Sequence, residues 1–278
     1  MIPGALPRAW PAESADGPGE RAWLADDVRP LVWNGPSERP FSRFEPGDLD
    51  RSVIDHFERV ASRYPRRVAV TDGARSLTNG QLWDGLSGLA ETIAARTAPG
   101  ALVGLLLPAG PMFPLAMLAC LAAGRPFVAL DVHYPAEWIG QVLADARPAL
   151  VIAEAAPPEG LETEVVLLTG LPAPARPGWR PAPLDPDAPA CVLFTSGSTG
   201  RPKGIVNSQR NLLQRVAQSI NAAHISDQDR FLTLASLCTI VGVRDALTAL
   251  IAGARLRLID PARVGAREIL AVVRDEAI

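Results

Sequence analysis

Several kinds of residue are scarce in this sequence, and each scarcity narrows what the protein can be. The cysteines are Cys120, Cys191 and Cys238, an odd number set far apart in apolar segments, which suits neither a disulfide framework nor a zinc site. We expect buried, reduced thiols, because free cysteine is among the most buried residue types. The net charge of -3 provides no basic excess for binding nucleic acid or an anionic membrane. Small molecules are therefore the expected ligands.

The sequence also lacks a long uninterrupted apolar run. The most apolar stretch, residues 101–123, contains Pro108, Pro111 and Pro114, whereas a membrane span needs about 20 predominantly apolar residues in one helix. The first 25 residues contain prolines and acidic residues but no apolar core of a secretory signal. We therefore expect a cytoplasmic protein without a transmembrane segment.

Apolar side chains are abundant, at 48% of 278 residues, which is enough for a sizeable core. Residues 1–46 are rich in Pro, Gly, Glu and Arg and show little periodicity, so they are predicted to form an extended arm. Residues 47–278 are predicted to form one large domain. The Pro-rich stretch 171–189 is interpreted as a surface loop inside that domain, in preference to a linker between two domains.

Strand-like and helical patterns alternate along this domain. Thr78 and Gln81 have the spacing of a capping box before an amphipathic helix. Strands are predicted at 68–70, 102–107, 127–130, 149–152, 164–168, 191–194, 231–234 and 256–259. Near-continuous apolar strands separated by helices are typical of mostly parallel β-structure with helices on both faces. The predicted fold class is α/β.

Residues 195–204 follow a predicted buried strand and combine three glycines, four hydroxyl residues and one lysine. Glycine lets the backbone approach a ligand closely, hydroxyl and backbone N–H groups donate to phosphate oxygens, and lysine adds positive charge. This composition suits a polyphosphate. The alternative that composition leaves open is a flexible surface loop.

The spacing within this loop differs from that of the commoner motifs. A Walker P-loop requires G-x-x-x-x-G-K-[ST], but Pro202 stands five residues after Gly197, and Lys203 is followed by Gly204. The dinucleotide fingerprint G-x-G-x-x-G is absent here. A nucleophile elbow is not matched either, and no histidine can be linked to Ser198 by sequence.

The order Thr-Ser-Gly-Ser-Thr-Gly-x-Pro-Lys-Gly closely resembles the signature of the adenylate-forming superfamily, which includes acyl-CoA synthetases and the adenylation domains of nonribosomal peptide synthetases. Residues 76–82 resemble the family segment L-T-Y-x-E-L, and residues 121–137 resemble K-A-G-G-A-Y-V-P-L-D-P-x-Y-P-x-E. The likeness covers roughly residues 50–278 in the family's order. It implies the N-terminal core of the adenylate-forming fold, incomplete and without the C-terminal lid.

The resemblance implies a ligase in which a carboxylate attacks the α-phosphate of ATP to give an acyl-adenylate and pyrophosphate. A thiol of a carrier protein or of coenzyme A then captures the acyl group, and Mg²⁺ is implied with the ATP. No catalytic residue or metal ligand is assigned. The residues implied to hold the β- and γ-phosphates are Thr195, Ser196, Gly197, Ser198, Thr199, Gly200 and Lys203.

Several departures from the family pattern bear on activity. Gln209 stands where relatives commonly have histidine, which changes a wall of the implied acyl site. Thr239 and Ile240 take the places of the family's Phe-Asp, and isoleucine cannot pair with the α-ammonium of an amino acid. A non-amino carboxylic acid, such as an aryl or fatty acid, is therefore implied; Asp245 offers a different registration of this segment.

The family's magnesium-binding Glu, ribose-binding Asp, hinge and lid lysine have no counterpart before Ile278. We therefore expect weak or no ligase activity from the chain by itself. The alternatives are a non-catalytic nucleotide or acyl-binding module and an inert remnant.

Two further groups of polar residues are given structural interpretations. Asp131, His133, Tyr134 and Pro135 are expected to form a turn that packs subdomains together, in preference to contacting a ligand. The arginines beside predicted strands are interpreted as solvated charges; these are Arg66, Arg67, Arg255 and Arg257.

Overall fold

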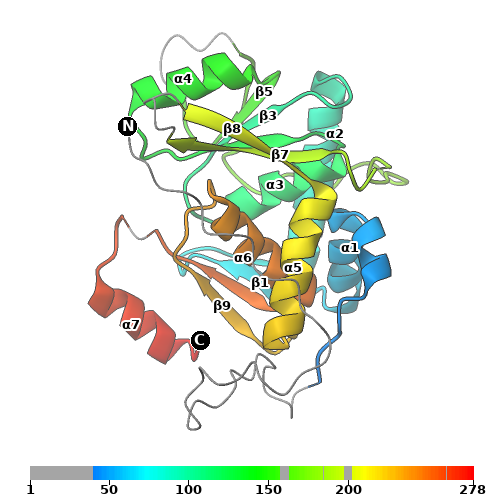
Figure 1. The fold of residues 1–278 in the computed structure, drawn as a ribbon, viewed down its shortest axis with the longest axis vertical. Coiled ribbons are helices and arrows are strands. Elements are labelled where there is room, and N and C mark those ends of the chain that lie inside the picture. The colour runs from blue at the N-terminus through cyan, green and yellow to red at the C-terminus, as the bar shows by residue number, and fades with distance from the viewer. Residues whose placement is uncertain (1–39, 157–162, 184, 197–201, 261) are drawn as a thin grey trace, which may run out of the picture. The chain divides into compact units, whose positions relative to one another are not determined.

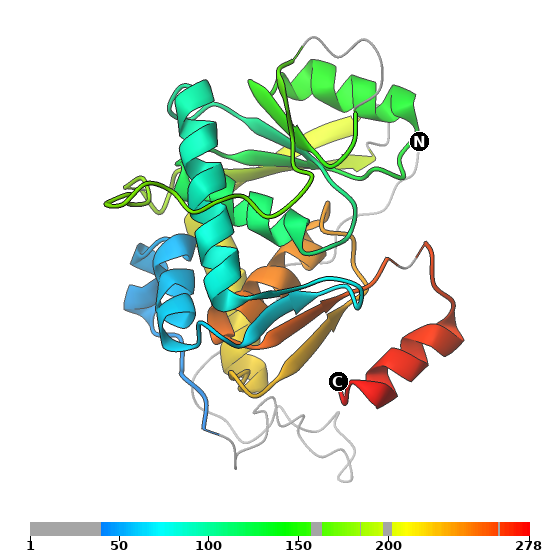
Figure 2. The ribbon, with the colours of Figure 1, turned by 180° about the vertical axis from the view of Figure 1, so that it is seen from behind.

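The computed structural model describes residues 40–156, 163–183, 185–196, 202–260 and 262–278. These residues contain two sheets, a four-stranded one in the order β2-β1-β10-β9 and a six-stranded one in the order β6-β5-β3-β4-β7-β8 (Figures 1 and 2). Neighbouring strands are parallel except in the pairs β1–β2 and β7–β8. The predicted α/β class with mostly parallel sheets is confirmed.

Eight of the described strands lie within two residues of a predicted strand, whereas β2 and β8 were not predicted. The strands are β1 (Val68–Thr71), β2 (Ser76–Thr78), β3 (Val103–Leu106), β4 (Phe127–Leu130), β5 (Leu150–Ala153), β6 (Val165–Leu167), β7 (Pro189–Ser196), β8 (Pro202–Ser208), β9 (Arg230–Thr233) and β10 (Arg255–Leu258). The helices are α1 (Val53–Arg63), α2 (Asn79–Arg96), α3 (Met112–Ala122), α4 (Ala136–Ala146), α5 (Gln209–Ala223), α6 (Ile240–Ala252) and α7 (Ala266–Asp275), with a 3₁₀ turn at Pro46–Asp50.

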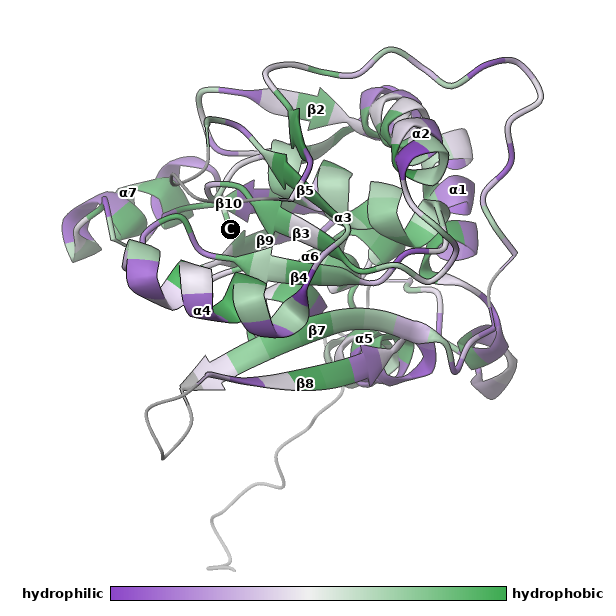
Figure 3. Cartoon of the chain, turned by 90° about the horizontal axis from the view of Figure 1, so that it is seen from above, coloured by the Kyte–Doolittle hydropathy of each residue, from purple (hydrophilic) through white to green (hydrophobic). Residues whose placement is uncertain are grey.

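Helices cover both faces of the six-stranded sheet. Every residue of α3 is buried, and α3 shares the larger hydrophobic core with residues of both sheets, including Val70 and Leu256. On the opposite face, Ile139 and Val142 of α4 pack with Val128 in a smaller core. Strands β3, β4 and β5 are buried at all four positions because each is covered on both sides. Figure 3 shows the hydrophobic residues concentrated in α3 and these central strands.

Helix starts follow local capping signals. The Thr78 side chain accepts a hydrogen bond from the Gln81 N–H, and the Gln81 side chain accepts one from the Thr78 N–H, so the predicted capping box is confirmed. Ser52 and Ser208 cap α1 and α5 in the same way. Each cap satisfies backbone donors that have no partner within the helix.

The Pro-rich connector between β6 and β7 packs on α2. The Ser87 hydroxyl oxygen accepts a hydrogen bond from the Ala175 N–H at 3.0 Å, and the rings of Trp83 and Trp179 meet edge to face, 6.2 Å between centroids. A Cβ added to Gly88 would lie 1.8 Å from the carbonyl oxygen of Ala173. The connector joins two strands of one sheet; that residues 47–278 form one domain stays a prediction.

The predicted arm lies mostly outside the described residues, which begin at Pro40. Phe44 is buried in the larger core, and its N–H and C=O bind the side chain of Asn221, both at 2.9 Å.

The three cysteines are free and buried, as expected, and burial raises the pKa of Cys191 to about 12. None of the described helices is long and apolar enough to cross a membrane.

Candidate functional site

The carboxyl ends of β3 and β4 form a topological switch point. The crossover from β3 to β4 runs through α3 on one face, and the crossover from β4 to β5 runs through α4 on the other. The two loops therefore diverge, which leaves a crevice at the carboxyl end of the sheet, the usual position of ligand sites in α/β folds.

A cavity of about 120 Å³ lies at this point. Its walls come from residues that follow β3 and β4 in one sheet and β9 and β10 in the other. The polar residues among them are Asp131, His133, Thr233, Ser236 and Asp260, beside the thiol of Cys238. The carboxyl ends of both sheets thus meet around one small cavity.

The predicted phosphate loop begins at the same edge of the six-stranded sheet. β7 lies beside β4, and β8 returns antiparallel to β7 (Figure 1). Thr195 is opposite Lys203 in this pair. Cys191 and Leu193 of β7 face the larger core, so Thr195, two residues further, continues on the same face. Residues directly opposite in an antiparallel pair share a face, and Lys203 therefore lies on it too.

Lys203 is exposed and forms no ion pair with a described residue, so its ammonium group is free for an anion. It is also the one lysine in the whole sequence. Ser196 ends β7 opposite Pro202. Gly197, Ser198, Thr199 and Gly200 lie outside the described residues, and their role in binding phosphate stays a prediction.

Close packing at the base of this loop requires glycine at position 204. It pairs with Phe194 across the β7–β8 ladder, and a Cβ placed on it would lie 3.0 Å from both the Phe194 ring and a methyl group of Val192. Such contacts are closer than side chains normally allow. Glycine at this position lets β8 run flat against the aromatic ring.

Asp131 and His133 connect the two sheets, as the sequence interpretation expected. Asp131 follows β4, and its Oδ2 accepts a hydrogen bond from the Ser236 hydroxyl at 2.9 Å. His133 lies with Nδ1 2.9 Å from Asp131 Oδ1 and Nε2 3.2 Å from Asp260 Oδ2. Ser236 and Asp260 follow β9 and β10 of the four-stranded sheet.

The environment of Asp131 favours its carboxylate form. Burial by itself raises the pKa of this carboxyl, but hydrogen bonds from the His133 backbone, Ser236 and the His133 ring lower it by more, so the net direction is downward. Burial raises the pKa of the neighbouring Cys238 thiol, and the charge of Asp131 adds to this effect. The cavity therefore presents a carboxylate and a neutral thiol.

Sequence reasoning did not identify Ser236 and Asp260 as parts of this site. One signal was available, because each polar residue comes shortly after an apolar strand, at its carboxyl end. In a parallel sheet such positions collect at one edge.

The segment that replaces the family's Phe-Asp begins α6. Thr239 caps the helix through its side-chain oxygen, which accepts a hydrogen bond from the Gly242 N–H at 3.2 Å, and Ile240 is the first helical residue. The Asp245 carboxylate pairs with the Arg244 guanidinium, 2.7 Å away. Neither Thr239 nor Ile240 can provide a carboxylate for an ammonium group.

Gln209, which stands where relatives commonly have histidine, is buried at the start of α5. Its side chain is only 1% exposed, and its Oε1 accepts a hydrogen bond from the Val53 N–H at 3.0 Å. The amide joins the start of α5 to the start of α1, where the buried Val53 N–H needs an acceptor.

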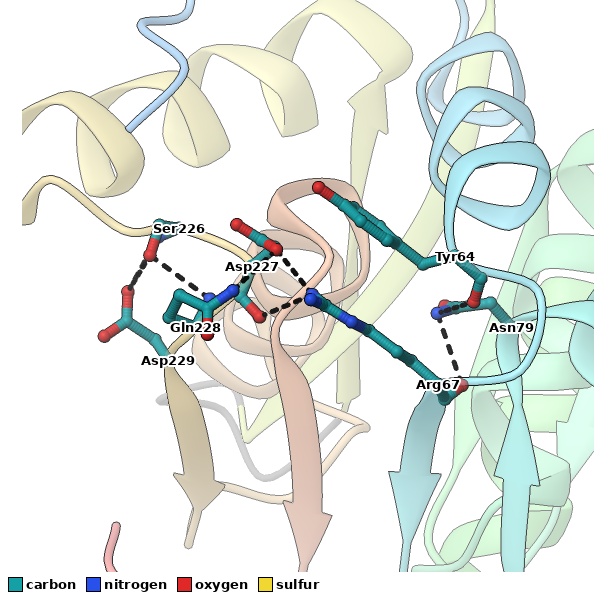
Figure 4. Close-up of polar contacts among 7 residues, drawn as sticks. All are labelled: Tyr64, Arg67, Asn79, Ser226, Asp227, Gln228 and Asp229. Carbon is teal, nitrogen blue, oxygen red and sulfur yellow. Dashed lines mark hydrogen bonds and ion pairs between the residues drawn. The ribbon is translucent and has the colours of Figure 1, made fainter. Parts of the chain in front are cut away.

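The arginines beside the strands of the four-stranded sheet were interpreted as solvated charges. Contacts in this sheet, beginning at its amino-terminal end, correct that interpretation. Arg67 lies over the Tyr64 ring, 4.2 Å from guanidinium carbon to centroid, and forms an ion pair with Asp227 before β9 (Figure 4). Arg255 and Arg257 of β10 both pair with Glu276. The prediction of simply solvated charges is wrong for these three residues, which link separate parts of the chain.

A larger cavity, of about 490 Å³, lies at this amino-terminal end. It is lined by residues such as Phe41, Arg59, Tyr64, Ile225 and Asp227. Its position is remote from the predicted phosphate loop. Among the described residues, no group of three or more His, Cys, Asp and Glu side chains is arranged to hold a metal ion.

Comparison with known proteins agrees with this geometry. The family model described as AMP-binding enzyme matches residues 57–278. CymA of Salinispora arenicola, a probable nonribosomal peptide synthetase, is 33% identical over 231 residues, which are 80% of this chain and 3% of CymA. Novobiocin biosynthesis protein H of Streptomyces niveus is 33% identical over 74% of this chain and 37% of its own length.

Solved structures of adenylation domains are also similar to this chain. The N-terminal subdomain of Klebsiella oxytoca NpsA superposes with a TM-score of 0.75 and 26% identity, over 83% of this chain and 60% of that one. The α-methyl-L-serine-AMP-bound form of the nonribosomal peptide synthetase FmoA3 superposes with a TM-score of 0.74 and 26% identity, over 86% of this chain and 27% of that one. The chain spans less than two thirds of each of these relatives. This chain belongs to the AMP-binding enzyme family and has the fold of the N-terminal subdomain of an adenylation domain.

Proposed function

We propose that this chain provides the phosphate-binding part of an ATP-dependent ligase that activates a carboxylic acid as an acyl-adenylate. The observation that carries the proposal is the pairing of Thr195 with Lys203 on one face of the sheet, beside the crevice where the two sheets meet. A hydroxyl and an unpaired ammonium at the carboxyl edge of a parallel sheet suit a polyphosphate.

In this proposal Lys203 holds the β- and γ-phosphates, which leave as pyrophosphate. Charge accumulates on those oxygens as the bond to the α-phosphate breaks, so a fixed cation stabilises the transition state more than the ground state. Thr195, Ser196, Gly197, Ser198, Thr199 and Gly200 are proposed to donate the remaining hydrogen bonds. Mg²⁺ would accompany the ATP and neutralise part of its charge; among the described residues, no three or more His, Cys, Asp and Glu side chains are grouped to hold it.

We propose a carboxylic acid without an α-ammonium group as the substrate, and a carrier-protein or coenzyme A thiol as the acceptor. Ile240 and its neighbour Thr239 bring no negative charge to the start of α6. In support, structures of NpsA contain anthranilyl and 3-hydroxybenzoyl analogues, and NpsA has been fused to a carrier domain, ThdA. The α-methyl-L-serine-AMP bound to FmoA3 represents the competing class.

ATP binding tests the proposal directly. Isothermal titration of the 278-residue chain with ATP and Mg²⁺ should give saturable binding that Lys203→Ala weakens by about tenfold or more, the usual effect of removing a charged hydrogen-bond donor. Lys203→Arg, which keeps the charge, should bind with intermediate affinity. The matched control is Arg96→Ala, a surface cation at the end of α2, which should bind like the wild type.

The single lysine allows a second measurement. An amine-reactive acyl-phosphate derivative of ATP should acylate Lys203 and no other side chain, and excess ATP should protect it. Absence of saturable binding together with unprotected labelling would overturn the proposal.

Pyrophosphate exchange separates the ligase from a nucleotide-binding module that does no chemistry. We expect weak or no exchange by this chain alone with benzoic, anthranilic or decanoic acid. Robust exchange would contradict that expectation and support ligase activity in these residues. Binding without exchange, even in a longer protein that contains these residues, would favour the binding module.

A further inference from the structure

His133 lies between two carboxylates that belong to different sheets. Its Nδ1 is 2.9 Å from Asp131 Oδ1, and its Nε2 is 3.2 Å from Asp260 Oδ2. Asp131 follows β4 of the six-stranded sheet, and Asp260 follows β10 of the four-stranded sheet. The imidazole ring therefore bridges the two carboxylates, with one ring nitrogen toward each.

Ser236 adds a second connection between the sheets. Its hydroxyl donates to Asp131 Oδ2 at 2.9 Å, while Asp131 Oδ1 also accepts the backbone N–H of His133 at 3.0 Å. Asp260 has partners on its own side, the Arg263 guanidinium at 3.4 Å and the Ala262 N–H at 3.0 Å. We call Asp131, His133, Ser236 and Asp260 the inter-sheet clasp.

The clasp lies close to the proposed phosphate site. β4 pairs with β7 at Phe127–Cys191 and Val128–Val192. Asp131 directly follows β4, and Thr195 lies near the carboxyl end of β7, opposite Lys203. The clasp and the start of the proposed phosphate site therefore lie at the carboxyl ends of neighbouring parallel strands.

We propose that His133 is a positioning residue that holds the carboxyl ends of the two sheets together beside the phosphate loop and thereby sets the affinity for nucleotide. Without His133, no hydrogen-bonding group stands between the carboxylates of Asp131 and Asp260. Their repulsion opens the crevice. This inference rests on the proposed ATP binding, and its test includes a measurement that does not need ATP.

The central experiment is a rescue by charge removal. His133→Ala should weaken ATP binding by about tenfold, the usual size of coupling between residues in contact. Adding Asp260→Asn removes the repulsion and should restore most of the affinity. If His133 mattered only through packing, neutralising a carboxylate would restore nothing. Because the His133 side chain is 36% exposed, millimolar imidazole should also reach the gap and partly restore binding to His133→Ala.

His224→Asn is the matched control. His224 is one of three histidines in the sequence, it stacks on Phe41 at the far end of α5, and asparagine tolerates its left-handed backbone. This variant should bind ATP like the wild type. If His133→Ala does not fold, His133→Gln, which keeps one donor, replaces it and should bind with intermediate affinity.

Unfolding measurements keep the two proposals separate. In urea, a double-mutant cycle of His133→Ala and Asp260→Asn should show a coupling of about threefold or more in the folding equilibrium constant, whether or not ATP binds. If the wild type fails to bind ATP but the coupling is present, the proposed function fails and the clasp stands. Unchanged ATP affinity in His133→Ala, absence of rescue by Asp260→Asn, or absence of coupling would overturn the clasp.

Discussion

The side-chain oxygen of Gln209 accepts a hydrogen bond from the backbone N–H of Val53 at 3.0 Å, across 156 positions of sequence. Each residue is the first of its helix, α5 for Gln209 and α1 for Val53, and both are buried. The N–H groups of a first helical turn have no partner inside the helix. This one amide therefore ties the starts of two helices together.

Replacing Gln209 with alanine should destabilise the protein. It leaves the Val53 N–H buried without an acceptor, which costs about 1–3 kcal/mol, and urea unfolding followed by circular dichroism measures the loss. Gln214→Ala, an exposed position of the same helix, is the control and should change the free energy of unfolding by less than about 0.5 kcal/mol. Equal effects at both positions would show that the hydrogen bond contributes nothing.

Gly88→Ala and Gly140→Ala should have opposite effects. An added Cβ at Gly88 would lie 1.8 Å from the Ala173 carbonyl oxygen, so α2 and the connector must separate, at a cost of about 1–3 kcal/mol. At Gly140, on the exposed side of α4, a Cβ meets nothing within 4 Å, and alanine should stabilise the helix by about 0.5–1 kcal/mol. The prediction fails if the two melting temperatures move in the same direction.

Gly204→Ala should disturb the base of the phosphate loop. The new methyl group meets the Phe194 ring and Val192 at 3.0 Å, which should lower stability by about 1 kcal/mol or more. Shortening the opposing side chain with Phe194→Leu should recover part of that loss when both changes are made. Thermal unfolding of the two single variants and the double variant tests this, and simple additivity would contradict it.

His56 should make the protein less stable in mild acid. Burial lowers the pKa of His56 below the ordinary value of 6.5, although a hydrogen bond to the Asp48 carbonyl opposes this. As the pH falls through 6.5, the unfolded chain takes up a proton before the folded chain does. Stability is therefore lost from about pH 6.5 downward until the folded pKa is reached, at up to about 1.4 kcal/mol per pH unit.

Urea unfolding at pH 7, 6 and 5 measures this dependence. His56→Gln has no titrating ring, so its stability should fall less steeply than that of the wild type. A wild-type slope in His56→Gln would show that the ring does not cause the loss.

The elements that sequence analysis predicted correctly are those with a local cause. Thr78 and Gln81, three positions apart, predict the start of α2 through a capping box. Apolar runs such as 127–130 predict buried strands. β8 was missed because Pro202 and Gly204 argue against a strand. It forms nonetheless at the edge of its sheet, where a proline that lacks an N–H removes no hydrogen bond from an inner ladder.

The parts of the site that sequence analysis missed depend on contacts between distant segments. Asp260 and Ser236 lie near His133 because the carboxyl ends of two sheets meet there, and no local pattern specifies that meeting. Gln209 was interpreted from a family position, but its hydrogen bond to Val53 depends on where the starts of α5 and α1 meet in the fold. A sequence motif indicates which chemistry a loop can perform, whereas the contacts of a side chain depend on the whole fold.

The strand order also has a consequence for how the chain acquires its structure. The six-stranded sheet is built from one continuous stretch, β3 to β8, but the four-stranded sheet pairs Val70 of β1 with Leu256 of β10. During synthesis, the first hairpin waits without its parallel neighbour while the larger sheet is already complete. Pairings across such long separations form slowly. We therefore expect the smaller sheet, and with it the crevice between the two sheets, to form after the six-stranded sheet.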